Sequence, residues 1–170
     1  ETFDQDAHSL SEALGIVLTS REIGKGQRVP MAGIPHHALE SYLSRLLDRG
    51  HRVAICEQKG DPTLSSGLVE RDVVRVITPG TIIEPNMLQS KTNNYLAVVI
   101  IEGDQAGIAY TDISTSTFET TQLETNLLAT ELDRIAPAEI VVPVGQGLDY
   151  MANIFTVDSL VPDVLGARQK

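Results

Sequence analysis

The first half of the chain alternates between helix-like and strand-like spacing of its hydrophobic residues. Four apolar residues lie three or four positions apart, as on one face of a helix: Phe3, Ala7, Leu10 and Leu14. We predict a helix over residues 3–14, ended by Gly15, a polar loop around Lys25, and a second helix from Pro35 to Gly50. Runs rich in β-branched residues predict strands at residues 16–19, 52–56 and 69–78. This half is therefore expected to be a mixed α/β domain.

The second half follows a polar stretch at residues 85–94, which we take as a domain boundary between domains at residues 1–90 and 94–170. Three strands, a helix and a further strand are predicted in turn at residues 95–101, 105–112, 117–122, 128–135 and 139–142. The ribonuclease H-like fold begins with this β-β-β-α-β order. We therefore expect a truncated domain of that fold, although fold order alone assigns no function.

Charge is distributed unevenly between the two halves. The chain carries a net charge of −10, which argues against a protein that coats nucleic acid through bulk positive charge. Residues 1–92 contain 10 Lys and Arg against 12 Asp and Glu, whereas residues 93–170 contain 3 against 11. Two domains with different tasks would explain this difference.

The composition indicates a cytoplasmic protein. No apolar run approaches the roughly 20 residues that span a bilayer, and the acidic, polar opening residues do not resemble a signal peptide. The single cysteine, Cys56, excludes an internal disulfide, and we expect it to be a packed thiol in a buried strand. Because the chain begins at Glu1 rather than Met, we expect a piece of a longer protein.

Catalytic and metal sites find little support in the sequence, so we assign no catalytic residue and no metal ligand. A phosphate-binding loop needs Gly-Lys followed by Ser or Thr, but Lys25 is followed by another Gly. A two-metal nuclease needs converging carboxylates, for which the candidates are Asp112, Glu119, Glu131 and Asp133. Asp112 is better explained by a turn, and the two on the predicted helix do not share a face. The adjacent His36 and His37 point different ways and make a poor metal site.

Several segments match a known family in the right order. Residues 29–38 read Val-Pro-Met-Ala-Gly-Ile-Pro-His-His-Ala, residues 53–58 read Val-Ala-Ile-Cys-Glu-Gln, and residues 78–81 read Thr-Pro-Gly-Thr. Shorter matches occur at residues 18–21, 60–62, 69–71 and 111–114. Together these segments resemble the mismatch-binding and connector domains of MutS DNA mismatch repair proteins, as far as about residue 143. The resemblance implies a mismatch-recognition domain that lacks its N-terminal part, followed by part of a connector domain.

The resemblance also implies which residues meet DNA. MutS proteins read mismatches with a Gly-Asp-Phe-Tyr-Glu motif, in which the Phe wedges beside the unpaired base and the Glu hydrogen-bonds it. Glu1 matches that Glu, and the wedge Phe would lie two residues before it; Phe3 is expected in the core, on the apolar face of the first helix. Phosphate contacts, which carry no base information, are expected from Arg21, Lys25 and Arg28. An apolar segment suited to lie against the DNA backbone consists of Met31, Ala32, Gly33 and Pro35.

Partners and cofactors are likewise implied by the resemblance. The expected ligand is duplex DNA with mismatches or small loops, and a MutL-type repair partner is expected at the connector. A homodimer is expected for the full-length protein, with this chain monomeric, in a bacterial cytoplasm and associated with the nucleoid. No cofactor is expected here, although the full-length protein would use ATP and Mg²⁺. Two other hypotheses stay open: a ribonuclease H-like metal-dependent nuclease, and an acidic protein-interaction module without DNA binding.

Overall fold

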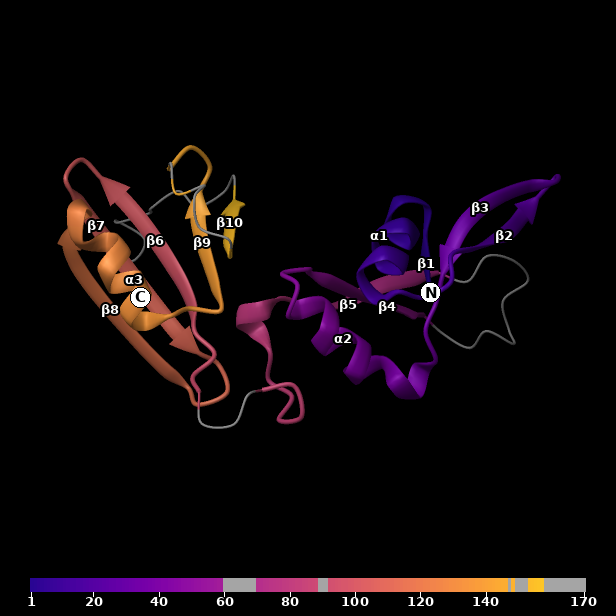
Figure 1. The fold of residues 1–170 in the computed structure, drawn as a ribbon, viewed down its shortest axis with the longest axis horizontal. Coiled ribbons are helices and arrows are strands. Elements are labelled where there is room, and N and C mark those ends of the chain that lie inside the picture. The colour runs from indigo at the N-terminus through magenta and orange to yellow at the C-terminus, as the bar shows by residue number, and fades with distance from the viewer. Residues whose placement is uncertain (60–69, 89–91, 147, 149–152, 158–170) are drawn as a thin grey trace. The chain divides into compact units, whose positions relative to one another are not determined.

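The computed structural model describes all residues except 60–69, 89–91, 147, 149–152 and 158–170. The chain divides into two compact units, one made of Glu1–Thr78 with Pro85–Met87 and the other of Pro79–Glu84 with Leu88–Lys170. Both units combine helices with β-sheets, which confirms the predicted mixed α/β class (Figure 1). The predicted loop at residues 60–62 lies outside the described residues.

The first unit contains a three-stranded antiparallel sheet. Its strands are β1 (Thr2–Phe3), β2 (Thr19–Gly24) and β3 (Gln27–Ala32), in the order β1-β3-β2. Helix α1 (Asp4–Leu14) contacts β3, and Ala7 of the helix and Ala32 of the strand are both fully buried. The predicted helix end is confirmed, because Gly15 is left-handed (φ 66°) and its N–H donates to the Ser11 carbonyl at 2.8 Å.

The expectation that Phe3 lies on the apolar face of this helix is wrong. Phe3 is extended (φ −132°), belongs to β1 and stands opposite Met31 in the sheet. Its side chain is only half-buried. Pairing with Met31 of β3 keeps Phe3 out of the helix. The spacing of hydrophobic residues near Phe3 contains no information about this distant partner.

The chain between the two helices forms a hairpin where the sequence predicted a strand and a loop. Residues 16–18 are not in a strand, and Val17 is 81% exposed. Strands β2 and β3 instead flank a two-residue turn made by Lys25 (φ 52°) and Gly26 (φ 76°). Positive φ at both central residues matches the turn type that suits the twist of paired strands. Because backbone hydrogen bonds rather than apolar burial hold this hairpin, hydrophobic spacing did not reveal it.

The rest of the first unit consists of a helix and a separate two-stranded sheet. The helical region starts later than predicted, with η1 (His36–Ala38) followed by α2 (Leu39–Leu47). The strands are β4 (Val53–Gln58) and β5 (Arg71–Ile77), which pair antiparallel. Cys56 on β4 is exposed, so the prediction of a packed thiol is wrong. Its β5 partner Val73 is also 57% exposed, which shows that β-branched residues here do not mark a buried strand.

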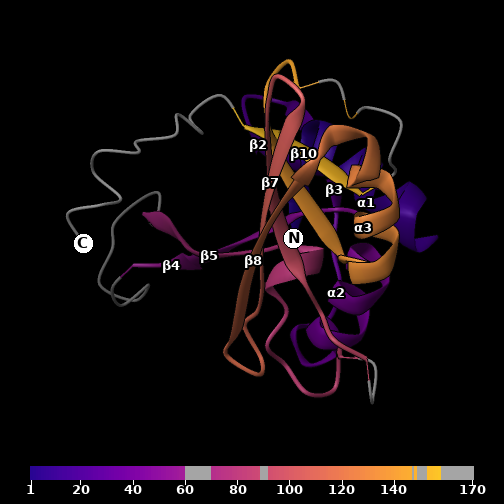
Figure 2. The ribbon, with the colours of Figure 1, turned by 90° about the vertical axis from the view of Figure 1, so that its left-hand side faces the viewer.

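The second unit is built on a five-stranded sheet in the order β10-β9-β6-β7-β8. The strands are β6 (Leu96–Glu102), β7 (Gln105–Asp112), β8 (Thr117–Glu124), β9 (Glu139–Pro143) and β10 (Ile154–Val157). After η3 (Thr125–Leu127), helix α3 (Leu128–Ile135) crosses one face of the sheet (Figure 2). Leu128 and Leu132 of the helix are buried against Ile108 and Ile140 of the sheet. The β6-β7-β8-α3-β9 order is the one predicted for the start of a ribonuclease H-like domain.

The turn η2 (Pro79–Thr81) belongs to this second unit. The Gly80 N–H donates to Oε2 of the buried Glu139 at 3.0 Å, and the Asn94 side-chain amide donates to the Pro79 carbonyl at 2.9 Å. A Cβ on Gly80 would lie 3.0 Å from side-chain atoms of both Glu139 and Leu96. A side chain at this position would therefore crowd Glu139 and Leu96, and glycine lets the Thr-Pro-Gly-Thr segment lie close against the sheet.

Candidate nucleic-acid interface

Glu1 lies at the edge of the β1-β3-β2 sheet, next to Gly33 of the apolar segment, which directly follows β3. Thr2 stands opposite Ala32, so Glu1 comes level with Gly33. A Cβ on Gly33 would lie 3.5 Å from the Cγ atom and 3.8 Å from the Cα atom of Glu1. The stem of Glu1 therefore packs beside Gly33, while its side chain stays 47% exposed.

Arg21 contacts the same carboxylate from β2, the strand at the opposite edge of the sheet. It lies on β2 opposite Val29, and its Nη1 atom is 3.1 Å from Oε2 of Glu1. Side chains alternate between the faces of a strand, so Arg21 shares a face with Val29 and Met31 of β3. Two of the four charged residues predicted from the sequence to meet DNA are thus brought together, although 20 positions separate them.

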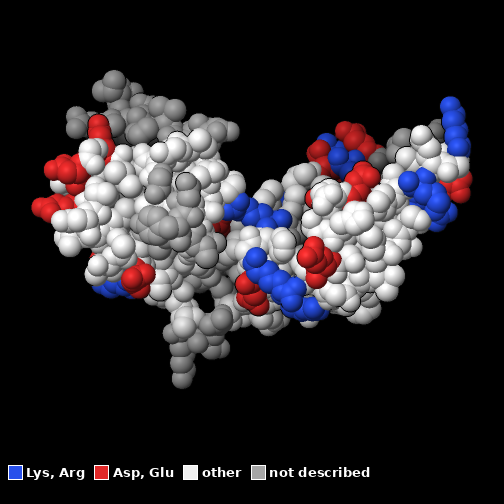
Figure 3. Space-filling model, turned by 45° about the horizontal axis from the view of Figure 1, so that its top comes forward, with Lys and Arg blue, Asp and Glu red and all other residues white. Residues whose placement is uncertain are grey.

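Arg28 is held on the opposite face of the hairpin. Its Nε donates to the Ser20 hydroxyl at 2.8 Å and its Nη2 donates to the Ser20 carbonyl at 2.9 Å. Lys25 occupies the exposed turn at the end of the hairpin. In Figure 3 Lys and Arg side chains lie at this end of the first unit and also elsewhere on it, whereas the charged side chains in view on the second unit are mostly acidic.

The apolar segment does not present all its predicted residues to solvent. Gly33 and Pro35 are exposed and Met31 is half-buried, opposite Phe3 on one side and Thr19 on the other. Ala32 is 0% exposed, so its side chain faces the protein interior. Its carbonyl accepts a hydrogen bond from the Thr2 hydroxyl at 3.3 Å, and its contribution is therefore to fix β1 against β3.

Comparison with known families accounts for both units. The sequence profile of MutS domain I matches residues 1–86, and that of MutS domain II matches residues 94–164. This chain belongs to the MutS family. The DNA mismatch repair protein MutS of Dehalococcoides mccartyi strain 195 is 54% identical over 149 residues, which cover 88% of this chain and 17% of the relative. MutS of Methanothrix thermoacetophila is 48% identical over 152 residues, covering 89% and 18%, and MutS of Acaryochloris marina is 50% identical over 145 residues, covering 84% and 16%.

The chain thus spans less than a fifth of the length of these MutS relatives. Within the part that the structure describes, no helix is long and apolar enough to cross a membrane. The matched stretches place Glu1 and the β2–β3 hairpin in MutS domain I and the five-stranded sheet in MutS domain II.

Three of the four carboxylates considered for a nuclease in MutS domain II accept hydrogen bonds from protein groups, whereas Asp133 is exposed. Asp112 is 1% exposed and accepts hydrogen bonds from the N–H groups of Asn94 (3.0 Å) and Ser114 (2.9 Å) and from the Ser114 hydroxyl (2.6 Å). Burial alone would raise the pKa of this carboxyl, but these hydrogen bonds outweigh burial and lower it. The predicted role of Asp112 in a turn is therefore confirmed.

Two further candidates, Glu119 and Glu131, are also engaged by protein groups. Glu119 accepts a hydrogen bond from the Tyr110 hydroxyl, which raises the pKa of Tyr110. Both carboxylate oxygens of Glu131 bind Arg134, at 2.9 and 2.7 Å, which lowers the pKa of Glu131. Among the described residues, no three His, Cys, Asp or Glu side chains are grouped as metal ligands would be.

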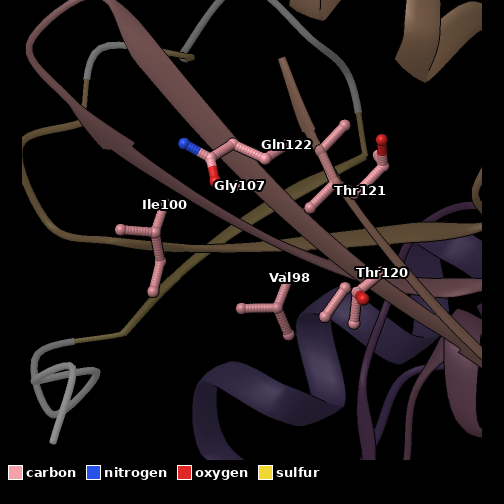
Figure 4. Close-up of a pocket in the computed structure, with 8 residues that line it drawn as sticks. Val98, Ile100, Gly107, Thr120, Thr121 and Gln122 are labelled. Atoms are coloured by element: carbon pink, nitrogen blue, oxygen red, sulfur yellow. The ribbon is translucent and has the colours of Figure 1, made fainter. Parts of the chain in front are cut away.

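The five-stranded sheet carries a hollow of about 450 Å³ on the face away from α3 (Figure 4). Its lining contains aliphatic and uncharged polar side chains, among them Val98, Ile100, Thr120 and Gln122 around Gly107. None of the described residues that line it is charged. The hollow therefore offers neither the carboxylates of a metal nuclease nor the cations of a phosphate site.

Two features of this site were not predicted from the sequence, the Glu1–Arg21 pair and the β2–β3 hairpin. The Glu1–Arg21 pair depends on the register of a strand only two residues long, for which the sequence carries no signal that we can identify. The hairpin did have one, because Lys25-Gly26 sits between two runs of equal length that can pair, and a Gly at the second position favours such a turn.

Proposed function

We propose that this chain reads mispaired or looped-out positions in duplex DNA as part of a mismatch repair protein. The observation that carries the proposal is the exposed Glu1 carboxylate, held beside Gly33 and Arg21 at the edge of the sheet in MutS domain I. The relatives that match this chain are themselves named DNA mismatch repair proteins.

Recognition in this proposal depends on how easily the duplex deforms. A mispaired step is already partly unstacked, so inserting an apolar ring from the minor groove costs less there than in regular DNA. The inserting ring is the Phe that the family motif has two residues before Glu1. The Glu1 carboxylate repels the DNA phosphates. At a mispair this repulsion is offset by a hydrogen bond from an exposed base N–H group to the carboxylate.

Backbone contacts come from the hairpin. Arg21, Lys25 and Arg28 lie on β2, on the turn and on β3, and all three are exposed. Such cations bind phosphates of any sequence and fix the register of the protein on DNA. Gly33 and Pro35 let the chain approach the sugar-phosphate backbone closely, since neither presents a long side chain.

The second unit serves a protein contact in this proposal. With 3 basic against 11 acidic residues in positions 93–170, it repels DNA and suits a basic partner, which we take to be a MutL-type repair protein. The longer protein acts as a homodimer and uses ATP with Mg²⁺ in regions beyond these two domains. The present chain supplies recognition and no catalytic step.

Fluorescence anisotropy with two duplexes that differ only by one mispair tests the proposal. The longer protein should prefer the mispaired duplex. The isolated chain should bind both duplexes weakly, with Kd values of about 1–100 μM at physiological salt, because it has the phosphate contacts but not the inserting ring. Equal affinity of the longer protein for both duplexes would overturn the proposed function.

A further inference from the structure

Glu1 and Arg21, which have different roles in the proposed function, form an ion pair with each other. Arg21 Nη1 and Glu1 Oε2 are 3.1 Å apart. Arg21 lies on β2, Glu1 directly precedes β1, and β3 lies between these two strands. Glu1 is therefore fixed at two points, by Gly33 along its stem and by Arg21 at its carboxylate. A carboxylate that reads a base must be held in this way if it is to meet a base edge at a defined position.

The Glu1–Arg21 ion pair can also be broken easily. The side chains are 55% and 47% exposed, and an ion pair in such a position is weak and screened by salt. A DNA phosphate is an equally good partner for a guanidinium group, since it can accept two parallel N–H bonds. Phosphate and Glu1 therefore compete for Arg21.

From this competition we propose that Arg21 is a specificity-determining residue that positions the Glu1 carboxylate and exchanges it for a DNA phosphate. The inference rests on the proposed function. At a mispair, Glu1 moves to the base N–H group and leaves Arg21 free for the phosphate. On paired DNA the carboxylate finds no base donor, stays with Arg21 and weakens the phosphate contact. Arg21 thus favours mispaired over paired DNA without touching a base.

Arg28 provides a matched control on the same hairpin. It has the same charge and similar exposure, but its guanidinium group binds Ser20 and not Glu1. Its removal should weaken binding to both duplexes by the same factor, because a phosphate contact alone carries no base information.

The test is a pair of double-mutant cycles in the longer protein. Dissociation constants for paired and mispaired duplexes are measured for the wild type, Glu1→Gln, Arg21→Ala, Arg28→Ala and the two double variants. Arg21→Ala and Glu1→Gln should each reduce the preference for the mispaired duplex, by roughly tenfold for one lost charge-assisted hydrogen bond, and the double variant should lose little more. Arg28→Ala should leave the preference unchanged in both backgrounds. Arg21→Lys should recover affinity for paired DNA but only part of the preference, because an ammonium group lacks the guanidinium fork.

Two failures can be told apart. One outcome is that Arg21→Ala weakens binding to both duplexes equally and behaves like Arg28→Ala in the Glu1→Gln background. Arg21 is then only a phosphate contact, so this inference is wrong, but the proposed function stands. If the wild type has no preference, or Glu1→Gln does not change it, the proposed function and this inference are both wrong.

Discussion

Charged residues in this chain are held in two ways that differ in energy. The exposed Glu1–Arg21 pair is worth about 0.2–1 kcal/mol to folding. A buried carboxylate such as Asp112, with three hydrogen bonds, is worth more, since an unsatisfied buried group costs about 1–3 kcal/mol. Changes at the first kind of site should therefore alter DNA binding with little loss of stability, and changes at the second should do the reverse.

Replacing Glu1 with Ala in the longer protein should change discrimination rather than affinity. Loss of the carboxylate removes its repulsion of phosphates, so paired DNA should bind more tightly, while the base hydrogen bond at a mispair is lost. Glu1→Asp should rescue only in part, because its shorter side chain does not reach the base. Binding to both duplexes over a salt series would show this. Equal weakening of both would mean that Glu1 has a structural role.

Replacing Asp112 with Asn should destabilise the second unit by about 1–3 kcal/mol, because an amide cannot accept all three hydrogen bonds as a carboxylate does. Since folding lowers the pKa of Asp112, its contribution is present above the unfolded pKa and is lost as pH falls through the folded value. Urea unfolding followed by circular dichroism between pH 3 and 7, in both proteins, measures it. A variant whose stability falls in acid as steeply as that of the wild type would contradict the assignment.

At the level of elements, the β2–β3 hairpin and the α3 sheet layer depend on different forces. The hairpin is made of largely exposed residues and is held by its turn and backbone pairing. Helix α3 is held by apolar burial, with Leu128, Leu132 and Ile135 almost fully enclosed. The hairpin therefore depends on a few backbone conformations, whereas the α3 layer depends on side-chain packing.

Gly26→Val should loosen the hairpin and weaken DNA binding. A β-branched residue at φ 76° costs about 1–2 kcal/mol, and nothing else in a two-residue turn offsets it. Lys25→Asn is the control, because Asn tolerates the left-handed conformation although it removes one charge. Anisotropy should show a larger loss for Gly26→Val than for Lys25→Asn, and nuclear magnetic resonance should show loss of the Arg21–Val29 pairing. Unchanged pairing in Gly26→Val would contradict this account of the hairpin.

At the scale of the whole molecule, charge separates the two units more clearly than fold class does. Both are α/β, but most of the acidic excess lies after residue 92. The salt dependence of DNA binding should accordingly come from the first unit, through its hairpin cations. The second unit keeps its buried carboxylates for its own fold, through Asp112 and Glu139.

The chain should show no nuclease or ATPase turnover with Mg²⁺ or Mn²⁺. The sequence lacks the Gly-Lys-Ser/Thr phosphate loop, and Asp112, Glu119 and Glu131 are each occupied by hydrogen-bond donors of the protein. Incubation of labelled duplex or ATP with the metal-loaded chain checks this. Cleavage that disappears in Asp112→Asn would favour the nuclease hypothesis instead.

Local sequence was enough to predict the elements in which buried residues recur at a regular spacing. Helix α1 with its end at Gly15, helix α3, and the β6-β7-β8-α3-β9 order were predicted because apolar residues recur at the period of each element. The ordered motifs also indicated the MutS family and singled out Glu1 and Arg21, because motifs preserve local chemistry.

Features that depend on partners distant in the sequence became visible in the folded chain alone. Phe3 joins a strand because β3 pairs with it, Cys56 is exposed because nothing in the described residues covers its face of β4, and Ala32 is buried beneath α1. The contact between Glu1 and Arg21 likewise needs the β1-β3-β2 order. Strand order and register are set by pairing between separate segments, and a local period of hydrophobic residues carries no information about which segments pair.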